Sequence, residues 1–159
     1  MNWQQICTDS SLQNLPYKIE LNRQGQIIMS PANVRHAILQ AKIIALLNKQ
    51  AENYLVVPGF PVETSDGVKV ADVGLLAMEQ AVALKDNVTS AVAPKVCVEV
   101  LSPSNNTLTE MQHKKELYFE QGAQEFWICD QTGCMSFYGR NGEIKTSRLV
   151  AEFSVDIDL

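Results

Sequence analysis

The sequence has few of the side chains that build zinc sites or histidine-based catalytic centres. It contains two histidines, His36 and His113, and four cysteines, none of which forms a Cys-x-x-Cys pair. A structural zinc cluster is therefore hard to assemble, and the cysteines are interpreted as reduced, mostly buried thiols. Ser102 and Ser104 lack the Gly-x-Ser-x-Gly context of a hydrolase nucleophile, which argues against a serine hydrolase.

Long apolar runs are also missing. The most apolar stretches, at 41–47 and 96–101, are far shorter than the roughly 18 to 20 residues that cross a bilayer. The N-terminal segment shows no cationic start followed by an apolar block and a small-residue cleavage site, as a secretory signal would. We therefore expect a cytoplasmic protein with no membrane partner.

Positive charge is in deficit. Lys and Arg number 13 against 18 Asp and Glu, which gives a net charge of −5. Non-specific coating of nucleic acid depends on many phosphate contacts by Lys and Arg, so this class of protein is disfavoured, although a local basic patch is compatible with the composition. The 159 residues, 46% of them hydrophobic, predict a single globular domain over 1–159 with a sizeable core.

Alternating patterns and turn residues predict several strands. Two short strands surround Gly25, two longer ones surround Asp66-Gly67, and a final hairpin surrounds Asn141-Gly142. The predicted strands are 17–21, 26–29, two strands within 53–77, 96–101, 125–130, 134–138 and 144–150.

Two main helices are predicted. In 33–49 apolar residues recur at three- and four-residue spacing, with Ser30 as the expected cap and Pro31 at the first helical position. Thr107 and Glu110 have capping-box spacing, and Gly122 is placed to end the helix that they begin. With a weakly helical or irregular segment at 78–89, the element order predicts a mixed sheet with helices packed on it.

Glu99 is an acid inside an otherwise apolar strand, Val-Cys-Val-Glu-Val-Leu at 96–101. Asp72 lies in a second apolar strand, and if the two strands are neighbours both carboxylates can converge. Two ionised acids in close contact repel each other unless a cation compensates, so a divalent ion would explain the pair. Mg²⁺ accepts such oxygen ligands, and the backbone carbonyl of Val100 is the candidate third ligand. Such an ion can polarise a phosphoryl oxygen and activate water.

A lysine would complete such a site by holding the attacking water or stabilising charge on the phosphate. The predicted helix after Glu99 offers Lys114, at the edge of its apolar stripe, and Lys115, closer to the middle. Helical geometry alone does not choose between them. A solvated helix face is the simpler interpretation of both, and Glu99 alone could instead be neutralised by a buried partner or lie at a strand end. His36 is given no chemical role.

The strings "YKIELNRQGQIIMSPANVRH", "VKVADVGLL" and "APKVCVEVLSPSNNTLTEMQHKKELYFEQGAQEFWICD" together resemble the family of Uma-type "putative restriction endonucleases" (domain of unknown function 820), a branch of the PD-(D/E)XK nuclease superfamily. The resemblance covers roughly 17–138. It implies an α/β (α+β) fold with a restriction-endonuclease-like core, a mixed central sheet flanked by helices, with β-hairpins at both ends of the chain.

The resemblance also implies site residues. By matching position, Asp72 and Glu99 would bind Mg²⁺ or Mn²⁺. The usual superfamily lysine would stand at Leu101, and Lys114 matches the helix lysine of this family instead. Glu20 matches an acid of the family opening and is a further candidate metal ligand.

Two hypotheses follow. The first is a Mg²⁺-dependent endonuclease that hydrolyses phosphodiester bonds in DNA, with Asp72, Glu99 and Lys114 as catalytic residues. The second is a nuclease-fold module without catalysis that binds nucleic acid or a protein partner, which the acidic composition favours. A homodimer would supply two sites for duplex cutting and could gather a positive track across two subunits.

Overall fold

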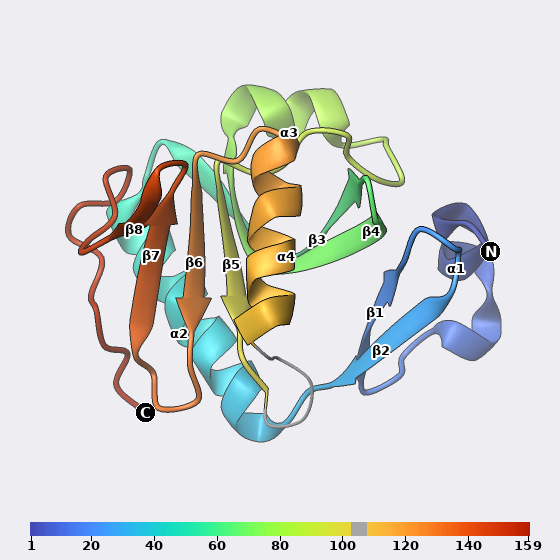
Figure 1. Ribbon diagram of the computed structural model, residues 1–159, viewed down its shortest axis with the longest axis horizontal. Coiled ribbons are helices and arrows are strands. Elements are labelled where there is room, and N and C mark those ends of the chain that lie inside the picture. The colour runs from blue at the N-terminus through green and yellow to red at the C-terminus, as the bar shows by residue number, and fades with distance from the viewer. Residues whose placement is uncertain (103–107) are drawn as a thin grey trace.

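The computed structural model describes residues 1–102 and 108–159 and is built around a six-stranded mixed sheet (Figure 1). The strand order is β3-β4-β5-β6-β7-β8. β5 and β6 run parallel, whereas the other neighbouring strands pair antiparallel. The strands are β3 (Tyr54–Thr64), β4 (Gly67–Ala77), β5 (Val96–Val100), β6 (Glu125–Cys129), β7 (Met135–Gly139) and β8 (Gly142–Ile144).

Two helices cover opposite faces of this sheet (Figure 1). α2 (Val34–Gln50) lies behind it in the view and α4 (Leu108–Glu120) lies in front. The α2 face buries a large apolar core that includes Leu39, Ile43 and Trp127. The α4 face buries a second core around Tyr118 and Phe126. Both faces of β5 are therefore covered, and all five of its residues are buried.

The N-terminal part of the chain forms a separate two-stranded sheet. β1 (Tyr17–Leu21) and β2 (Ile27–Pro31) pair antiparallel, after the short helices α1 (Trp3–Thr8) and η1 (Ser10–Leu12). A small apolar cluster of Ile6, Leu21 and Val68 joins this hairpin to the first half of β4. The remaining helix, α3 (Met78–Leu84), follows β4.

The predicted fold class is confirmed, with a mixed sheet between helices and a hairpin near each end. The Asp66-Gly67 turn joins β3 to β4, and Gly67 adopts φ +77° there. Gly122 follows α4 with φ +100°, as expected for a helix-ending glycine. The predicted Thr107 cap lies outside the described residues. Helix α1 was not predicted, and α3 is shorter than the weakly helical 78–89 segment.

The predicted cap of α2 is wrong, although the helix begins at Val34, one residue after the predicted start at 33. Ser30 and Pro31 belong to β2, where they pair with Lys18 and Tyr17. Asn33 caps the helix instead, since its side chain accepts a hydrogen bond from the His36 amide at 2.8 Å. Both Ser-Pro and Asn are good helix-start signals, and the pairing with β1 decides between them.

The predicted final strand, 144–150, is also wrong. β8 ends at Ile144, and after it Val150 and Phe153 pack into the large apolar core. The backbone amides of Arg148 and Leu149 donate to the buried carboxylate of Glu125, at 2.9 and 3.0 Å. These amides therefore satisfy a side chain rather than a strand ladder. Among the described residues, no helix is long and apolar enough to cross a bilayer.

Candidate active site

Three buried acids and two lysines meet near the junction of the two sheets. Glu20 comes from β1, Asp72 from β4 and Glu99 from β5, and their exposed fractions are 4%, 3% and 2%. Lys18 of β1 and Lys114 of α4 contact these acids. Buried charges of one sign are costly unless opposite charges accompany them, so a cluster of three buried acids is unusual in the interior of a fold.

Asp72 lies at an interruption in the β3–β4 ladder. Pairing is regular on both sides, from Pro58 with Val73 and from Phe60 with Ala71, but Gly59 and Asp72 between them are not paired. Gly59 adopts φ +57° at this point, a conformation that favours glycine. The backbone carbonyl of Asp72 is free to accept a hydrogen bond from Gln40 Nε2 of α2, at 2.7 Å.

The Asp72 carboxylate is fixed by its Oδ2 atom. Oδ2 accepts a hydrogen bond from the Val100 amide at 2.8 Å, and His36 Nε2 lies 3.5 Å away. Oδ1 faces the ammonium of Lys18 at 3.1 Å. The carboxylate is thus held from β5 and α2, with one oxygen directed toward a cation.

Glu99 is held in the same way. Its Oε2 atom accepts from the Asp72 amide and from the Tyr118 hydroxyl, both at 3.4 Å. Its Oε1 atom accepts from Lys18 at 3.0 Å and from Lys114 at 2.8 Å. The acid in the apolar strand therefore has two partly buried cationic partners, and it shares one of them, Lys18, with Asp72.

The structure separates the two candidate lysines. Lys114 Nζ lies 2.8 Å from Glu99 Oε1 and 2.9 Å from Glu20 Oε1. Lys115 points to the other side of α4, where its ammonium lies 5.0 Å from the centre of the Tyr138 ring. Lys114 alone of this pair reaches the acids.

Comparison with known proteins gives the family and the fold of the chain. The family model "Uma2: Putative restriction endonuclease" matches residues 4–153. The chain belongs to the Uma2 family. It is also similar in structure to "a putative nuclease belonging to DUF820 from Anabaena variabilis ATCC 29413", with a TM-score of 0.71 and 16% identity over 87% of this chain and 86% of that one. The likeness shows a shared fold, while the search of curated proteins gave no match.

Lys18 is a residue of this Uma2 chain that the sequence reasoning missed. Its Nζ atom donates to Asp72 Oδ1 and to Glu99 Oε1, at 3.1 and 3.0 Å. A signal was available, since alternate residues of a strand share a face and Lys18 stands two before Glu20. His36 was likewise given no role, although it stands four residues before Gln40 on α2 and both contact Asp72.

Glu20, predicted as a possible metal ligand, uses both oxygens within the protein. Oε2 accepts from the Val70 amide at 2.7 Å and from Lys114 at 3.0 Å, and Oε1 lies 2.9 Å from the same ammonium. In this structure Glu20 therefore holds Lys114 against Glu99. Direct metal binding by Glu20 stays a prediction.

The charges in this Uma2 site shift several pKa values. Burial opposes ionisation of Asp72, but Lys18, His36 and the Val100 amide outweigh it and hold the pKa of Asp72 well below its usual range. Burial likewise opposes ionisation of Glu20, yet Lys18 and Lys114 lower its pKa. Burial alone would lower the pKa of Lys18, but the neighbouring acids raise it well above its usual value. Asp72, Glu20 and Lys18 are therefore charged at neutral pH.

The site fits a divalent cation by its donor chemistry. Asp72 Oδ1 and Glu99 Oε1 converge on one point, because a single ammonium lies within 3.1 Å of both. A small cavity of about 20 Å³ beside them is lined by both acids, Val100 and Lys114, and this volume suffices for one water-sized particle. Among the described residues no three His, Cys, Asp or Glu side chains form a ready metal cage. Asp72 and Glu99 therefore offer two carboxylate ligands. The Val100 carbonyl as the third ligand stays a prediction.

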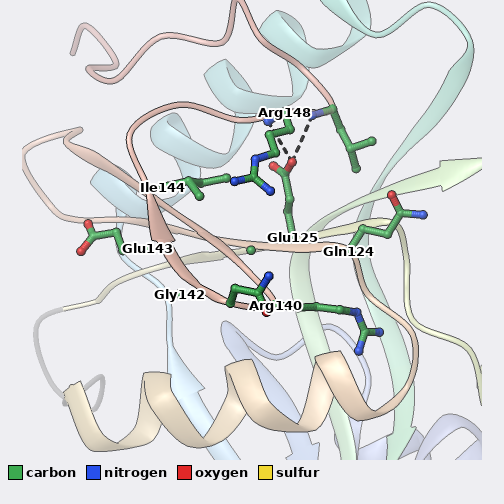
Figure 2. Close-up of a pocket in the computed structure, with 10 residues that line it drawn as sticks. Gln124, Glu125, Arg140, Gly142, Glu143, Ile144 and Arg148 are labelled. Carbon is green, nitrogen blue, oxygen red and sulfur yellow. Dashed lines mark hydrogen bonds between the residues drawn. The ribbon is translucent and has the colours of Figure 1, made fainter.

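A different cavity, of about 370 Å³, lies at the far edge of the sheet between β8 and the 148–149 segment (Figure 2). Its buried acid, Glu125, accepts hydrogen bonds from two backbone amides, drawn as dashed lines, and from Trp127 Nε1 and Ser147 Oγ. All four contacts lie within 3.0 Å. Glu125 thus anchors the loop that follows β8, and this cavity offers no cluster of acids and lysines comparable to the site at Asp72.

Proposed function

We propose that this protein is a Mg²⁺-dependent endonuclease that hydrolyses phosphodiester bonds in DNA. Asp72 and Glu99 hold the ion, with the Val100 carbonyl as a further ligand, and Mn²⁺ can replace Mg²⁺. The single observation that carries the proposal is the convergence of Asp72 Oδ1 and Glu99 Oε1 on one cation position. Membership of the Uma2 family and the nuclease fold support the reaction class.

When bound, Mg²⁺ supplies charge that polarises the phosphoryl oxygen and lowers the pKa of a coordinated water. The protein supplies a fixed scaffold for this chemistry. The Val100 and Asp72 amides hold the two acids through the carboxylate oxygens that Lys18 does not contact. Because these groups are in place before the reaction, little reorganisation is needed in the transition state.

Lys114 orients the attacking water or stabilises the charge that builds on the phosphate. Its ammonium is kept beside Glu99 by contacts to Glu20 and Glu99 at 2.9 and 2.8 Å. Both acids are buried, so the lysine has a defined position rather than a solvated one. A cation fixed at this point meets the requirement for catalysis by positioned charge.

The test is cleavage of plasmid and linear DNA by the purified protein with Mg²⁺, Mn²⁺ or EDTA. We expect cleavage with either ion and none with EDTA. The isosteric variants Asp72→Asn and Glu99→Gln should lose activity and also lose Mn²⁺ binding in calorimetry. Cleavage that survives both substitutions would rule out the assigned site.

A second candidate function is a nuclease-fold module that binds nucleic acid or a protein partner without cutting. The net charge of −5 favours the form that binds a protein partner, because binding or cleaving nucleic acid needs a positive track for the phosphate backbone. A homodimer of this single-domain chain could provide that track across two subunits. Absence of divalent-ion binding at neutral pH in calorimetry would support the module over the enzyme, and light scattering would test the dimer.

A further inference from the structure

We propose that Lys18 is a displaceable internal cation: its ammonium occupies the position that the divalent ion takes between Asp72 and Glu99, and it leaves when the ion binds. The inference rests on the proposed function, because it concerns the same metal site. On this proposal Lys18 limits the affinity of the site for metal, and it keeps the Asp72 and Glu99 carboxylates in place until an ion binds.

The hydrogen bonds of the two acids define a single cation position. Asp72 Oδ2 is tied to the Val100 amide, and Glu99 Oε2 faces the Asp72 amide and the Tyr118 hydroxyl. The remaining oxygens, Asp72 Oδ1 and Glu99 Oε1, both accept from Lys18 Nζ. A divalent ion that binds one oxygen from each acid must therefore use the oxygens that Lys18 uses.

The ammonium and the ion exclude each other. Lys18 Nζ lies 3.1 and 3.0 Å from the two oxygens, whereas Mg²⁺ binds carboxylate oxygens at about 2.0–2.1 Å. An ion at that distance from both oxygens would be in contact with Nζ, and the two positive charges would repel each other strongly in a buried site. Metal binding thus requires the Lys18 side chain to move.

The Lys18 side chain is more exposed than either acid and has space beside it. Its side chain keeps an exposed fraction of 18%, against 4% for Asp72 and 3% for Glu99. It also lines a cavity of about 720 Å³ between α2 and the N-terminal segment, together with Tyr17, Val34 and Asp72. A flexible four-carbon stem can rotate into this space while the β1 backbone stays in place. Lys114 remains, because Glu20 still holds it.

Lys18 offsets the electrostatic cost of placing the two acids side by side. Without a cation, Asp72 and Glu99 would repel each other at close range inside the fold. Lys18 neutralises this repulsion and keeps both carboxylates aimed at the cation position. The cost is competition, since each binding event must first break two charge-assisted hydrogen bonds.

The test is calorimetric titration of Mn²⁺ into the wild type, Lys18→Met and Lys115→Met. Methionine keeps the length of the stem without the charge. We expect Lys18→Met to bind Mn²⁺ at least roughly tenfold more tightly, the scale of a lost charge-assisted contact. The Lys115→Met control removes a lysine that contacts Tyr138 instead of the acids, and its affinity should equal that of the wild type.

The outcomes separate this inference from the proposed function. Equal or weaker binding by a folded Lys18→Met protein, with binding by the wild type, overturns the inference and leaves the metal site standing. Absence of Mn²⁺ binding in every protein overturns both. Loss of binding in Asp72→Asn confirms that the titration reports this site.

A second measurement needs no variant at position 18, in case Lys18→Met fails to fold. The wild type is treated with a lysine-acylating reagent with and without Mg²⁺, and the labelled sites are quantified by mass spectrometry. Labelling of Lys18 should rise severalfold with Mg²⁺, because the displaced ammonium becomes more exposed. Labelling of Lys115 should stay constant. Unchanged or reduced labelling of Lys18 overturns the inference.

Discussion

Lys114 and Glu99 are in direct contact, with 2.8 Å between Nζ and Oε1. They stand on consecutive elements, α4 and β5, and α4 crosses over one face of the sheet on the way to the parallel strand β6 (Figure 1). The crossover places the side chain of a helix over the end of a strand. The contact therefore follows from topology and not from local sequence, and it gives α4 a role in the site beyond covering the core.

Removing the Lys114 charge should abolish cleavage while the fold survives. We expect Lys114→Met to lower the rate of DNA cleavage by at least about 100-fold, the scale of a lost positioned catalytic group. The matched control is Lys115→Met, which removes the neighbouring charge outside the site and should retain activity. Cleavage assays with unfolding curves for both variants test this, and equal losses in the two would contradict it.

Glu20→Gln should separate metal binding from lysine positioning. The amide keeps the shape of the side chain but loses the ionic contact that holds Lys114 at 2.9 Å. If Glu20 acts through Lys114, the variant should bind Mn²⁺ with wild-type affinity in calorimetry and cleave DNA roughly 10-fold or more slowly. A large loss of Mn²⁺ affinity would instead show that Glu20 is a metal ligand.

Gly67→Ala should destabilise the protein more than Gly122→Ala. Both glycines have positive φ, +77° and +100°, so both substitutions strain the backbone. At Gly67 a Cβ atom would lie 2.3 Å from the Leu21 carbonyl oxygen, whereas at Gly122 it would meet nothing within 4 Å. We expect a loss of about 1 kcal/mol at Gly122 and at least about 2–3 kcal/mol at Gly67, measured by urea unfolding. Equal losses of stability in the two variants would show that the contact with the Leu21 carbonyl at the end of β1 does not restrict position 67.

Asp66 should make stability depend on acidic pH. Burial opposes its ionisation, but His113 at 2.8 Å, the Arg23 amide at 3.0 Å and Lys69 lower its pKa. Because the folded pKa lies below the unfolded value of about 3.9, the stabilisation is full above that pH and is lost as pH falls through the folded pKa. Urea unfolding should show Asp66→Asn less stable than wild type at pH 6, with a gap that narrows below about pH 4. A gap that stays constant down to pH 3 would contradict this.

Much of the fold could be predicted because local patterns and tertiary packing agree. The Asp66-Gly67 turn, the 96–101 strand and the helix before Gly122 are all present at nearly the predicted positions. The failures occur where a distant group decides. Ser30 and Pro31 pair with β1, and the backbone amides that follow β8 donate to Glu125. Neither contact can be inferred from the neighbouring residues in the sequence.

The candidate site was predictable in part for the same reason. Asp72 and Glu99 stand out as acids in apolar strands, and in the structure both carboxylates contact the ammonium of Lys18. Lysines have long stems and their reach depends on the fold, so helical periodicity could not separate Lys114 from Lys115. Lys18 was missed because a short hairpin outside the main sheet carries it, and the packing of β1 beside β4 brings it to the acids.

The small sheet of β1 and β2 supplies Lys18 and Glu20, yet within the described part of the chain its strands pair only with each other. Local opening of this hairpin would remove one lysine and one acid from the cluster at once and would leave the six-stranded sheet fully bonded. Hydrogen exchange should then reveal a sub-global unfolding step, of lower free energy than complete denaturation, that disassembles the charged cluster.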